Sequence, residues 1–307
     1  MKLAGLGTVL GAVLVATTPA HAQPAHLFFD DFSQPDLQAL RDAGWVLRDA
    51  PGHPGVPGAR WLPEALSLFD DPDDVRQGPR NRLLWLTART DGTPQGTLQA
   101  QICHQRKLLN GTYAARVRFS DLPIGGADGD PVIQTFYAVA PLRFAFDPEF
   151  SEIDWEYLPN GGWGSPQTRL YAIAWQTVQV EPWQAFNAAR ETPGSQAGWR
   201  TLLMQVHEGS SRWFVDGREL ALHGGRNHPV VPMAISFNLW FSPAGLLPPG
   251  GAPRVWAQDV DWVLHAANQV LTPAQVQDTV RSLRAQGLQR VDSVPAAVPA
   301  LSSPCSF

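Results

Sequence analysis

Hydrophobic and polar residues alternate along most of this chain with the two-residue period of a half-buried β-strand. In one such segment Ile235, Phe237 and Leu239 fall on one face and the residues between them on the other. Asp216-Gly217 separates two segments, and Asp-Gly between β-rich runs is a strong hairpin signal. The segments expected to be strands are 26–32, 83–90, 97–104, 111–120, 132–139, 152–157, 169–176, 199–207, 211–215, 233–241 and 254–265.

Short strands separated by turn signals about every ten residues are typical of an all-β sandwich. We therefore expect one β-sandwich domain over residues 23–268. Residues 34–80 are rich in Pro, Asp, Gly and Ala and show no sustained period, so they are expected to form loops with one short helical turn. No internal repeat and no second domain is indicated.

A single helix is expected after the last strand, at 273–286 within the segment 269–288. Thr272 is placed to be its N-cap, Gln275 completes a capping box, and Gly287 ends it. An apolar stripe along one face would hold the helix against the domain. The stripe consists of Val276, Val280 and Leu283.

The two ends of the sequence differ in composition from the expected β-sandwich domain. The chain starts with Lys2, a short apolar run and an Ala20-His21-Ala22 end, which is the pattern of a secretory signal peptide over residues 1–22. Cleavage after Ala22 would give an exported protein. Residues 289–307 are rich in Pro, Ala and Ser and are expected to form a flexible tail, unless Cys305 anchors it.

The cysteine count leaves two possibilities open. Cys103 and Cys305 are the two cysteines of the chain. In an oxidising compartment they could form one disulfide that ties the tail to the domain, and two unpaired thiols are the alternative.

The net charge and the number of tryptophans limit the classes of partner that the protein is expected to bind. The net charge is −5, and loss of Lys2 with the signal peptide makes it −6, which argues against nucleic acid or an anionic membrane as a partner. Twelve tryptophans are a high number for 307 residues. Some belong to the core, and others suit the apolar faces of sugar rings. We expect a monomer that binds carbohydrate.

The candidate chemistry lies in the segment 152–157. If it is a strand, Glu152, Asp154 and Glu156 share one face, while Ile153, Trp155 and Tyr157 share the other. The Cα atoms of the two glutamates would be roughly 13 Å apart at about 3.3 Å per residue. Long side chains could bring their carboxyl groups close to the ~5–5.5 Å used by retaining glycoside hydrolases. A solvated acidic face is the alternative, and a calcium loop would need Gly and Asn between the acids.

This acidic segment resembles the E-I-D-x-E signature of glycoside hydrolase family 16. Shorter stretches occur in the order of that family, and the likeness covers about residues 27–265. These stretches are Asp30-Asp31-Phe32, Gly111-Thr112-Tyr113-Ala114-Ala115-Arg116-Val117, Trp213-Phe214-Val215-Asp216-Gly217, Asn238-Leu239-Trp240 and Val260-Asp261-Trp262-Val263.

The resemblance implies a β-jelly-roll of two curved antiparallel sheets with a cleft on the concave side. It also implies retaining hydrolysis of a β-linked polysaccharide, with Glu152 as nucleophile, Glu156 as general acid/base and Asp154 tuning both. The spacing of the acids is that of licheninases and xyloglucan transglycosylases, without the additional residue of laminarinases and agarases.

Some positions depart from the family pattern. Phe150 stands where many members carry Trp, and Ala114 stands where some β-glucanases have Glu beside a matching Arg116. No sugar-binding asparagine can be placed in the strand expected at 169–176. These differences concern the substrate and leave the catalytic acids intact.

The residues expected to bind substrate are predicted to lie near the acids or on the face of the sheet that lines the cleft. For each tryptophan, including Trp183, core packing is the alternative, and for Arg116 it is solvated surface. The expected set is Arg116, Phe150, Asn160, Trp163, Trp175, Asn238 and Trp240.

No cofactor is required by this chemistry. Members of the family often hold a structural calcium on the convex side, and Asp31 and Asp261 are weak candidates for its ligands. The eight histidines show no metal-binding spacing. The leading hypothesis is a secreted retaining endo-glycosidase. A transglycosylase using the same cleft and a lectin-like protein without turnover are the alternatives.

Overall fold

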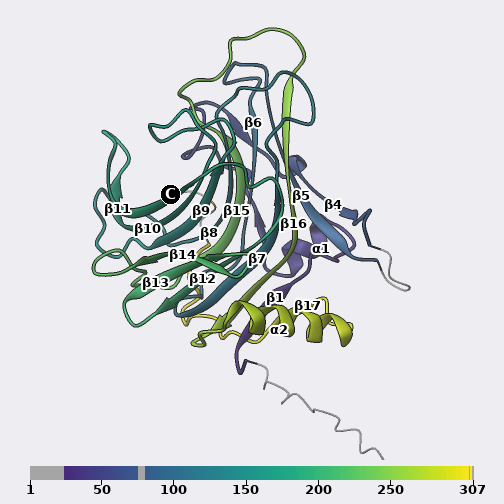
Figure 1. Ribbon diagram of the computed structural model, residues 1–307, viewed down its shortest axis with the longest axis vertical. Coiled ribbons are helices and arrows are strands. Elements are labelled where there is room, and N and C mark those ends of the chain that lie inside the picture. Colours follow the sequence, from purple (N-terminus) through teal and green to yellow (C-terminus); the bar gives the residue numbers. More distant parts are fainter. Residues whose placement is uncertain (1–23, 75–79, 304, 306–307) are drawn as a thin grey trace, which may run out of the picture.

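The computed structural model describes residues 24–74, 80–303 and 305. Two curved antiparallel sheets pack against each other in a β-jelly-roll, and the helix near the C-terminus lies outside them (Figure 1). The all-β fold with a C-terminal helix is as expected. The signal peptide predicted for residues 1–22 lies outside the described residues.

One sheet, which we call the helix sheet, has the C-terminal helix on its outer face. Two further strands, β1 (Leu27–Asp30) and β17 (Arg290–Asp292), continue it beside the second half of β16. In order across the sheet, its main strands are β4 (Leu66–Asp70), β5 (Arg82–Thr90), β16 (Arg254–Ala267), β7 (Gly111–Phe119), β12 (Gly198–His207), β13 (Ser210–Val215) and β14 (Arg218–His223).

The other sheet, which we call the cleft sheet, has the candidate acids on its outer face. In order, its strands are β2 (Val46–Leu47), β6 (Leu98–Cys103), β15 (Ala234–Phe241), β8 (Val132–Val139), β9 (Glu152–Leu158), β10 (Arg169–Gln179) and β11 (Gln184–Pro193). Five short elements lie in residues 34–80, the segment expected to be loops: the strands β2 and β4 already given, and α1 (Leu37–Asp42), β3 (Arg60–Trp61) and the 3-10 turn Pro63–Ala65.

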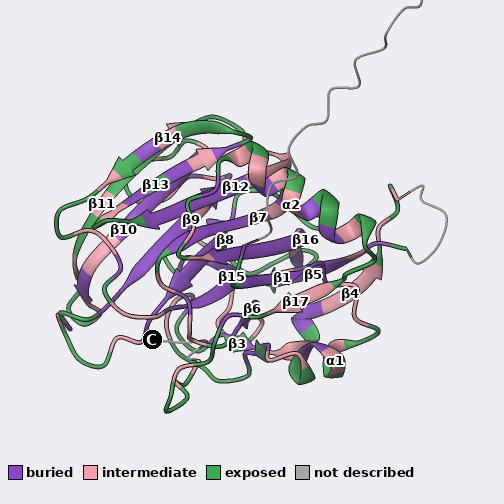
Figure 2. Ribbon diagram, turned by 90° about the horizontal axis from the view of Figure 1, so that it is seen from below, coloured by how far each residue is buried: buried purple, intermediate pink, exposed green. Residues whose placement is uncertain are grey.

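The main core lies between the two sheets. Ile153, Trp155 and Tyr157 of β9 are fully buried there, as their alternation with the acids predicts. The central strands β8, β9 and β15 are buried along nearly their whole length, whereas the edge strand β11 is mostly exposed (Figure 2). A strand buried on both faces is held rigidly, so side chains on β9 are well positioned.

The C-terminal helix α2 (Pro273–Ala285) confirms the sequence prediction. Thr272 is its N-cap, and both hydrogen bonds of the capping box with Gln275 are present. The apolar stripe packs on the outer face of the helix sheet, against residues that include Leu203, Trp262 and Leu264. The buried stripe is Val276, Val280 and Leu283.

The tail has the anchored form that the sequence left open, in which Cys305 ties it to the domain. The described residues after α2 are tied to the domain at two places, so they do not form a free tail. Strand β17 pairs with β1, and Cys305 forms a disulfide with Cys103 at a Cα–Cα distance of 5.6 Å. Of the two cysteine states left open by the sequence, the structure has the disulfide. Within the described residues no helix is long and apolar enough to cross a membrane.

Candidate active site

Strand β9 lies between β8 and β10 in the middle of the cleft sheet. Asp154 is opposite Tyr137 on one side and Ile173 on the other, and Glu156 is opposite Thr135 and Tyr171. Antiparallel pairing on both sides fixes the direction of each side chain. All three acids therefore point away from the core.

The acids open into a cavity of about 750 Å³ on the outer face of the cleft sheet. Glu152 and Asp154 are almost fully buried, at 7% and 3% exposed, and Glu156 is partly buried. Concave, partly apolar cavities with a few convergent polar groups are the usual form of ligand sites. The part of the sequence expected to carry the chemistry thus forms the floor of the cavity.

Burial and mutual repulsion perturb the three carboxyl groups. Burial raises the pKa of Glu152, and the charge of Glu156 raises it further. Burial and both glutamates raise the pKa of Asp154, against a hydrogen bond from Trp175. Burial raises the pKa of Glu156 to about 7, against a hydrogen bond from Trp163. The three acids cannot all ionise freely, so the cluster can hold a proton near neutral pH.

Two tryptophan side chains donate hydrogen bonds to the acids. Nε1 of Trp175 donates to Oδ2 of Asp154 at 2.8 Å, and Nε1 of Trp163 donates to Oε2 of Glu156 at 2.7 Å. The other oxygen of Asp154, Oδ1, is buried and has no hydrogen-bond partner among the described residues. Asp154 and Glu156 therefore have different hydrogen-bond environments.

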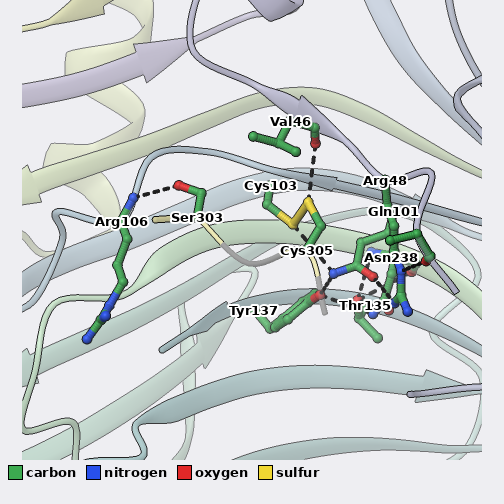
Figure 3. Close-up of a disulfide and its surroundings, with 11 residues drawn as sticks. Val46, Arg48, Gln101, Cys103, Arg106, Thr135, Tyr137, Asn238, Ser303 and Cys305 are labelled. Atoms are coloured by element: carbon green, nitrogen blue, oxygen red, sulfur yellow. Dashed lines mark hydrogen bonds between the residues drawn. A yellow bond between two sulfur atoms is a disulfide. The ribbon is translucent and has the colours of Figure 1, made fainter. Parts of the chain in front are cut away.

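Hydrogen-bonded polar side chains from β6, β8 and β15 form a network beside the acids (Figure 3). Nε2 of Gln101 donates to the hydroxyl of Tyr137 at 2.6 Å, and Nδ2 of Asn238 lies 3.2 Å from the same hydroxyl. Thr135 donates to Oδ1 of Asn238 at 2.6 Å. Behind them the buried Arg48 donates to Gln101 at 2.7 Å. These contacts fix polar groups that face the cavity.

Aromatic rings form the walls on both sides of the acids. Trp163 and Trp240 face each other with ring centroids 6.0 Å apart. Trp175 and Trp183 meet edge to face at 6.2 Å, and His53 stacks on Trp183 at 5.8 Å. Such rings can pack against the apolar faces of sugars.

Four of the seven residues expected to bind substrate line this cavity, namely Trp163, Trp175, Asn238 and Trp240. Trp183, the fourth tryptophan considered, lines it too. Asn160 does not. Its side-chain amide donates to Asp128 and to the backbone of Asp130, so it holds two loops together.

Arg116 and Phe150 were also assigned to the cleft wrongly. Arg116 is on β7 of the helix sheet, where it forms an ion pair with Asp261 at 2.6 Å and lies over the ring of Trp199. Phe150 is 1% exposed and packs against Tyr137, Val139 and Val178, behind the residues that line the cavity.

Several cavity residues were not identified from the sequence. His53, Pro54, Gly55 and Pro57 come from a Pro- and Gly-rich loop without periodicity, and nothing in that pattern indicates a site. Alternation within the expected strands could have suggested others, because they share faces with the acids or with Trp175. These are Gln101, Thr135, Tyr137, Tyr171 and Ile173, whereas Asn187 lies on β11, in a segment where no strand was expected.

The calcium candidates Asp31 and Asp261 do not fit a metal site. Oδ1 of Asp261 accepts hydrogen bonds from Arg284 and Asn81, both at 2.7 Å, and its other oxygen binds Arg116. Nε of Arg284 also lies 3.9 Å from Asp31. A guanidinium group thus occupies the place between the two acids. Within the described ranges, no group of three or more His, Cys, Asp or Glu side chains could hold a metal ion.

Solved structures share this fold at low sequence identity. No protein-family model matches the chain, and no curated protein matches it. The Bacillus licheniformis β-glucanase is 14% identical with a TM-score of 0.55, over 80% of this chain and 100% of the other. A family 16 endo-glucanase from Bacteroides ovatus is 15% identical with a TM-score of 0.55, over 77% and 98%. The κ-carrageenase of Pseudoalteromonas carrageenovora is 15% identical with a TM-score of 0.51, over 81% and 98%. The chain therefore has the fold of family 16 glycoside hydrolases.

Proposed function

We propose that the protein is a secreted retaining endo-glycosidase that hydrolyses a β-linked, β-glucan-like polysaccharide. One observation carries the proposal: three carboxyl groups with raised pKa values lie side by side on the floor of a cavity walled by tryptophan rings. Raised carboxyl pKa values in a cleft are typical of catalytic sites. The shared fold supports this chemistry, because the solved relatives are named as glycoside hydrolases.

In the proposed first step, the carboxylate of Glu152 attacks the anomeric carbon. Glu156 donates its proton to the glycosidic oxygen, the bond to the leaving sugar breaks, and a covalent glycosyl-enzyme forms. In the second step the carboxylate of Glu156 takes a proton from water, which attacks the same carbon and releases Glu152. Glu156 suits both steps because its pKa of about 7 lets it give and take a proton near neutral pH.

Asp154 lies between the two glutamates, and its role is to let one of them ionise while the other stays protonated. Its raised pKa and its unpartnered Oδ1 make it a place for a proton of the cluster. A neutral Asp154 removes one of three adjacent negative charges, so Glu152 can ionise for its attack.

The substrate is proposed to be an uncharged polysaccharide. The charged residues that line the cavity are Glu152, Asp154, Glu156 and Glu181, and no lysine or arginine of the described chain lines it. A sulfated or uronic-acid polysaccharide would bring negative charge to these carboxylates without a compensating cation. Secretion is supported by the Cys103–Cys305 disulfide, which needs an oxidising compartment to form and persist.

The test is activity on a panel of β-glucans, xyloglucan, galactans and agars, measured as new reducing ends. We expect turnover on a neutral β-linked polymer, and loss of about 1,000-fold or more in kcat for Glu152→Gln and for Glu156→Gln, with cooperative thermal unfolding at or above the wild-type temperature as the control for folding. NMR of the first product should show the β-anomer, because two displacements retain configuration.

Four outcomes would contradict the proposal in different ways. Full activity in either variant refutes the assigned roles, and an α-anomeric first product refutes retention. Binding of the polymers without any product over days favours a lectin-like protein. Transfer to an added acceptor oligosaccharide in place of hydrolysis would identify a transglycosylase with the same first step.

A further inference from the structure

Trp163 stands in a turn that does not favour it. Gly162 and Ser165 exchange two backbone hydrogen bonds of 2.8 and 3.0 Å, so Trp163 and Gly164 form a two-residue hairpin turn. Both central residues have positive φ, 50° for Trp163 and 88° for Gly164. Asn and Gly are the usual residues in this turn, because a bulky side chain at positive φ is strained.

The conformation directs the Trp163 side chain toward Glu156 of β9. Trp163 is 46% exposed, so burial in the core does not explain a tryptophan at this position. Its indole N–H donates to Oε2 of Glu156 at 2.7 Å, and its ring faces Trp240. A strained residue whose main polar contact is a candidate catalytic carboxyl group points to a functional role.

We propose that Trp163 is a positioning residue for the acid/base, whose indole N–H occupies Oε2 of Glu156 so that Oε1 carries the proton that is given to the leaving sugar. This deepens the proposed function and rests on it. It assigns to Trp163 a role in proton transfer beyond that of a sugar platform.

The contact would act mainly in the transition state. As the O–H bond of Oε1 breaks and the glycosidic oxygen takes the proton, negative charge develops on the carboxyl group of Glu156. An N–H donor binds a carboxylate about twice as strongly as it binds a neutral acid. The Trp163 hydrogen bond therefore strengthens as the leaving group departs, and a donor placed before the reaction lowers the barrier.

Other groups also act on Glu156. Asp154 and Glu152 lie on the same face of β9, and Tyr171 is opposite on β10. Past Tyr171, Arg169 and Glu191 form an ion pair at 2.8 Å. All of these residues are retained in Trp163→Phe, which removes the indole N–H and keeps an aromatic ring, so the effect of Trp163 can be measured separately.

The direct test measures the pKa of Glu156 by ¹³C NMR of its side-chain carboxyl, assigned by comparison with Glu156→Gln. In Trp163→Phe the pKa should rise by roughly half a unit to one unit, because the charged form loses a donor while an aromatic ring stays. Trp183→Phe is the matched control, since Trp183 lines the same cavity and contacts His53 and Trp175 through its ring. In the control the pKa of Glu156 should stay at its wild-type value.

An unchanged pKa in Trp163→Phe overturns the proposal, and so does an equal rise in both variants, which would reflect hydration of the cavity. This readout needs no substrate, so its result is separate from success or failure of the proposed glycosidase function. Thermal unfolding at the wild-type temperature shows that the variant is folded.

Where a hydrolysed polymer is found, kinetics provides a second readout. In Trp163→Phe we expect kcat to fall about 10- to 100-fold with little change in KM, and the alkaline limb of the pH profile to move to higher pH. A loss confined to KM would show a platform only and would contradict the positioning role.

Discussion

Glu156 shows how a single residue links the stability of the protein to its proposed chemistry. Its pKa is raised to about 7 by burial, so the folded protein opposes its ionisation. A carboxyl whose folded pKa lies above its unfolded value leaves stability intact below the unfolded pKa and reduces it as pH rises through the folded pKa. Glu156 therefore costs the protein stability at alkaline pH.

Replacement of Glu156 by Gln should remove that cost. At pH 8 we expect the variant to be more stable than the wild type by about 3 kcal/mol, since burial raises the pKa from 4.5 to about 7 and each unit of pKa shift corresponds to about 1.4 kcal/mol. At pH 4 the two proteins should differ little in stability, because Glu156 of the wild type is mostly protonated in the folded and in the unfolded state. Urea unfolding at the two pH values measures this. A gain at pH 4 as large as that at pH 8 would contradict an effect of ionisation.

The same pKa predicts the alkaline limb of the wild-type activity. If Glu156 is the acid in the first step, kcat/KM should fall as pH rises through about 7, with a slope of one proton. Initial rates between pH 4 and 10 on the best substrate of the panel would show it. Constant kcat/KM up to pH 9 would exclude Glu156 as the acid.

Residue positions could be predicted from the sequence only as far as alternation determines them. The period of two correctly places Glu152, Asp154 and Glu156 on one face. It cannot say which of two sheets a strand joins, and this is why Arg116, on the outer face of the helix sheet, was assigned to the cleft. Trp163 was found as a cavity residue, but its contact with Glu156 depends on a turn geometry that alternation does not contain.

At the scale of elements, α2 was predicted within one residue because its signals are local. The N-cap, capping box and apolar stripe all lie within residues 272–287. Strand β17, in contrast, has three residues and is held by pairing with β1, more than 250 residues away in the sequence. No local pattern predicts such a strand. The cavity wall formed by the Pro- and Gly-rich loop around His53 was missed for the same reason.

The cap of α2 gives a prediction at this scale. Thr272→Ala should lower the free energy of unfolding by about 1 kcal/mol, because the backbone N–H of Gln275 loses its acceptor. Thr272→Ser keeps the hydroxyl group and is the matched control, with a change of a few tenths of a kcal/mol. Chemical denaturation measures both variants. Activity should stay unchanged, since α2 lies on the helix sheet, away from the cavity.

At the scale of the whole molecule, the disulfide joins positions 202 residues apart and connects the tail to the cleft sheet. Cys103 is the last residue of β6, two positions after the cavity residue Gln101, whose amide also contacts its sulfur at 3.4 Å (Figure 3). The bond therefore links the C-terminal segment to the strand that carries part of the site.

Loss of this bond should destabilise the protein. For Cys103→Ser with Cys305→Ser we expect a decrease of about 2–5 kcal/mol in the free energy of unfolding, since a long loop in the unfolded chain is no longer closed. Wild-type protein treated with a reductant should approach the double variant, and reductant should not affect the double variant itself. Equal stability of wild type and variant would show that β17 alone secures the tail.

The place of the two cysteines also sets the order of events during synthesis. Every strand from β7 to β17 lies between Cys103 and Cys305 in the sequence, so the thiol of Cys103 is made long before its partner exists. The bond can therefore form only after all the strands from β7 to β17 have been synthesised. The presence of the disulfide therefore shows that the chain has been made at least to residue 305. A chain that ends earlier keeps a free thiol at Cys103, next to the cavity. A thiol-reactive label would distinguish such a chain from the full-length protein.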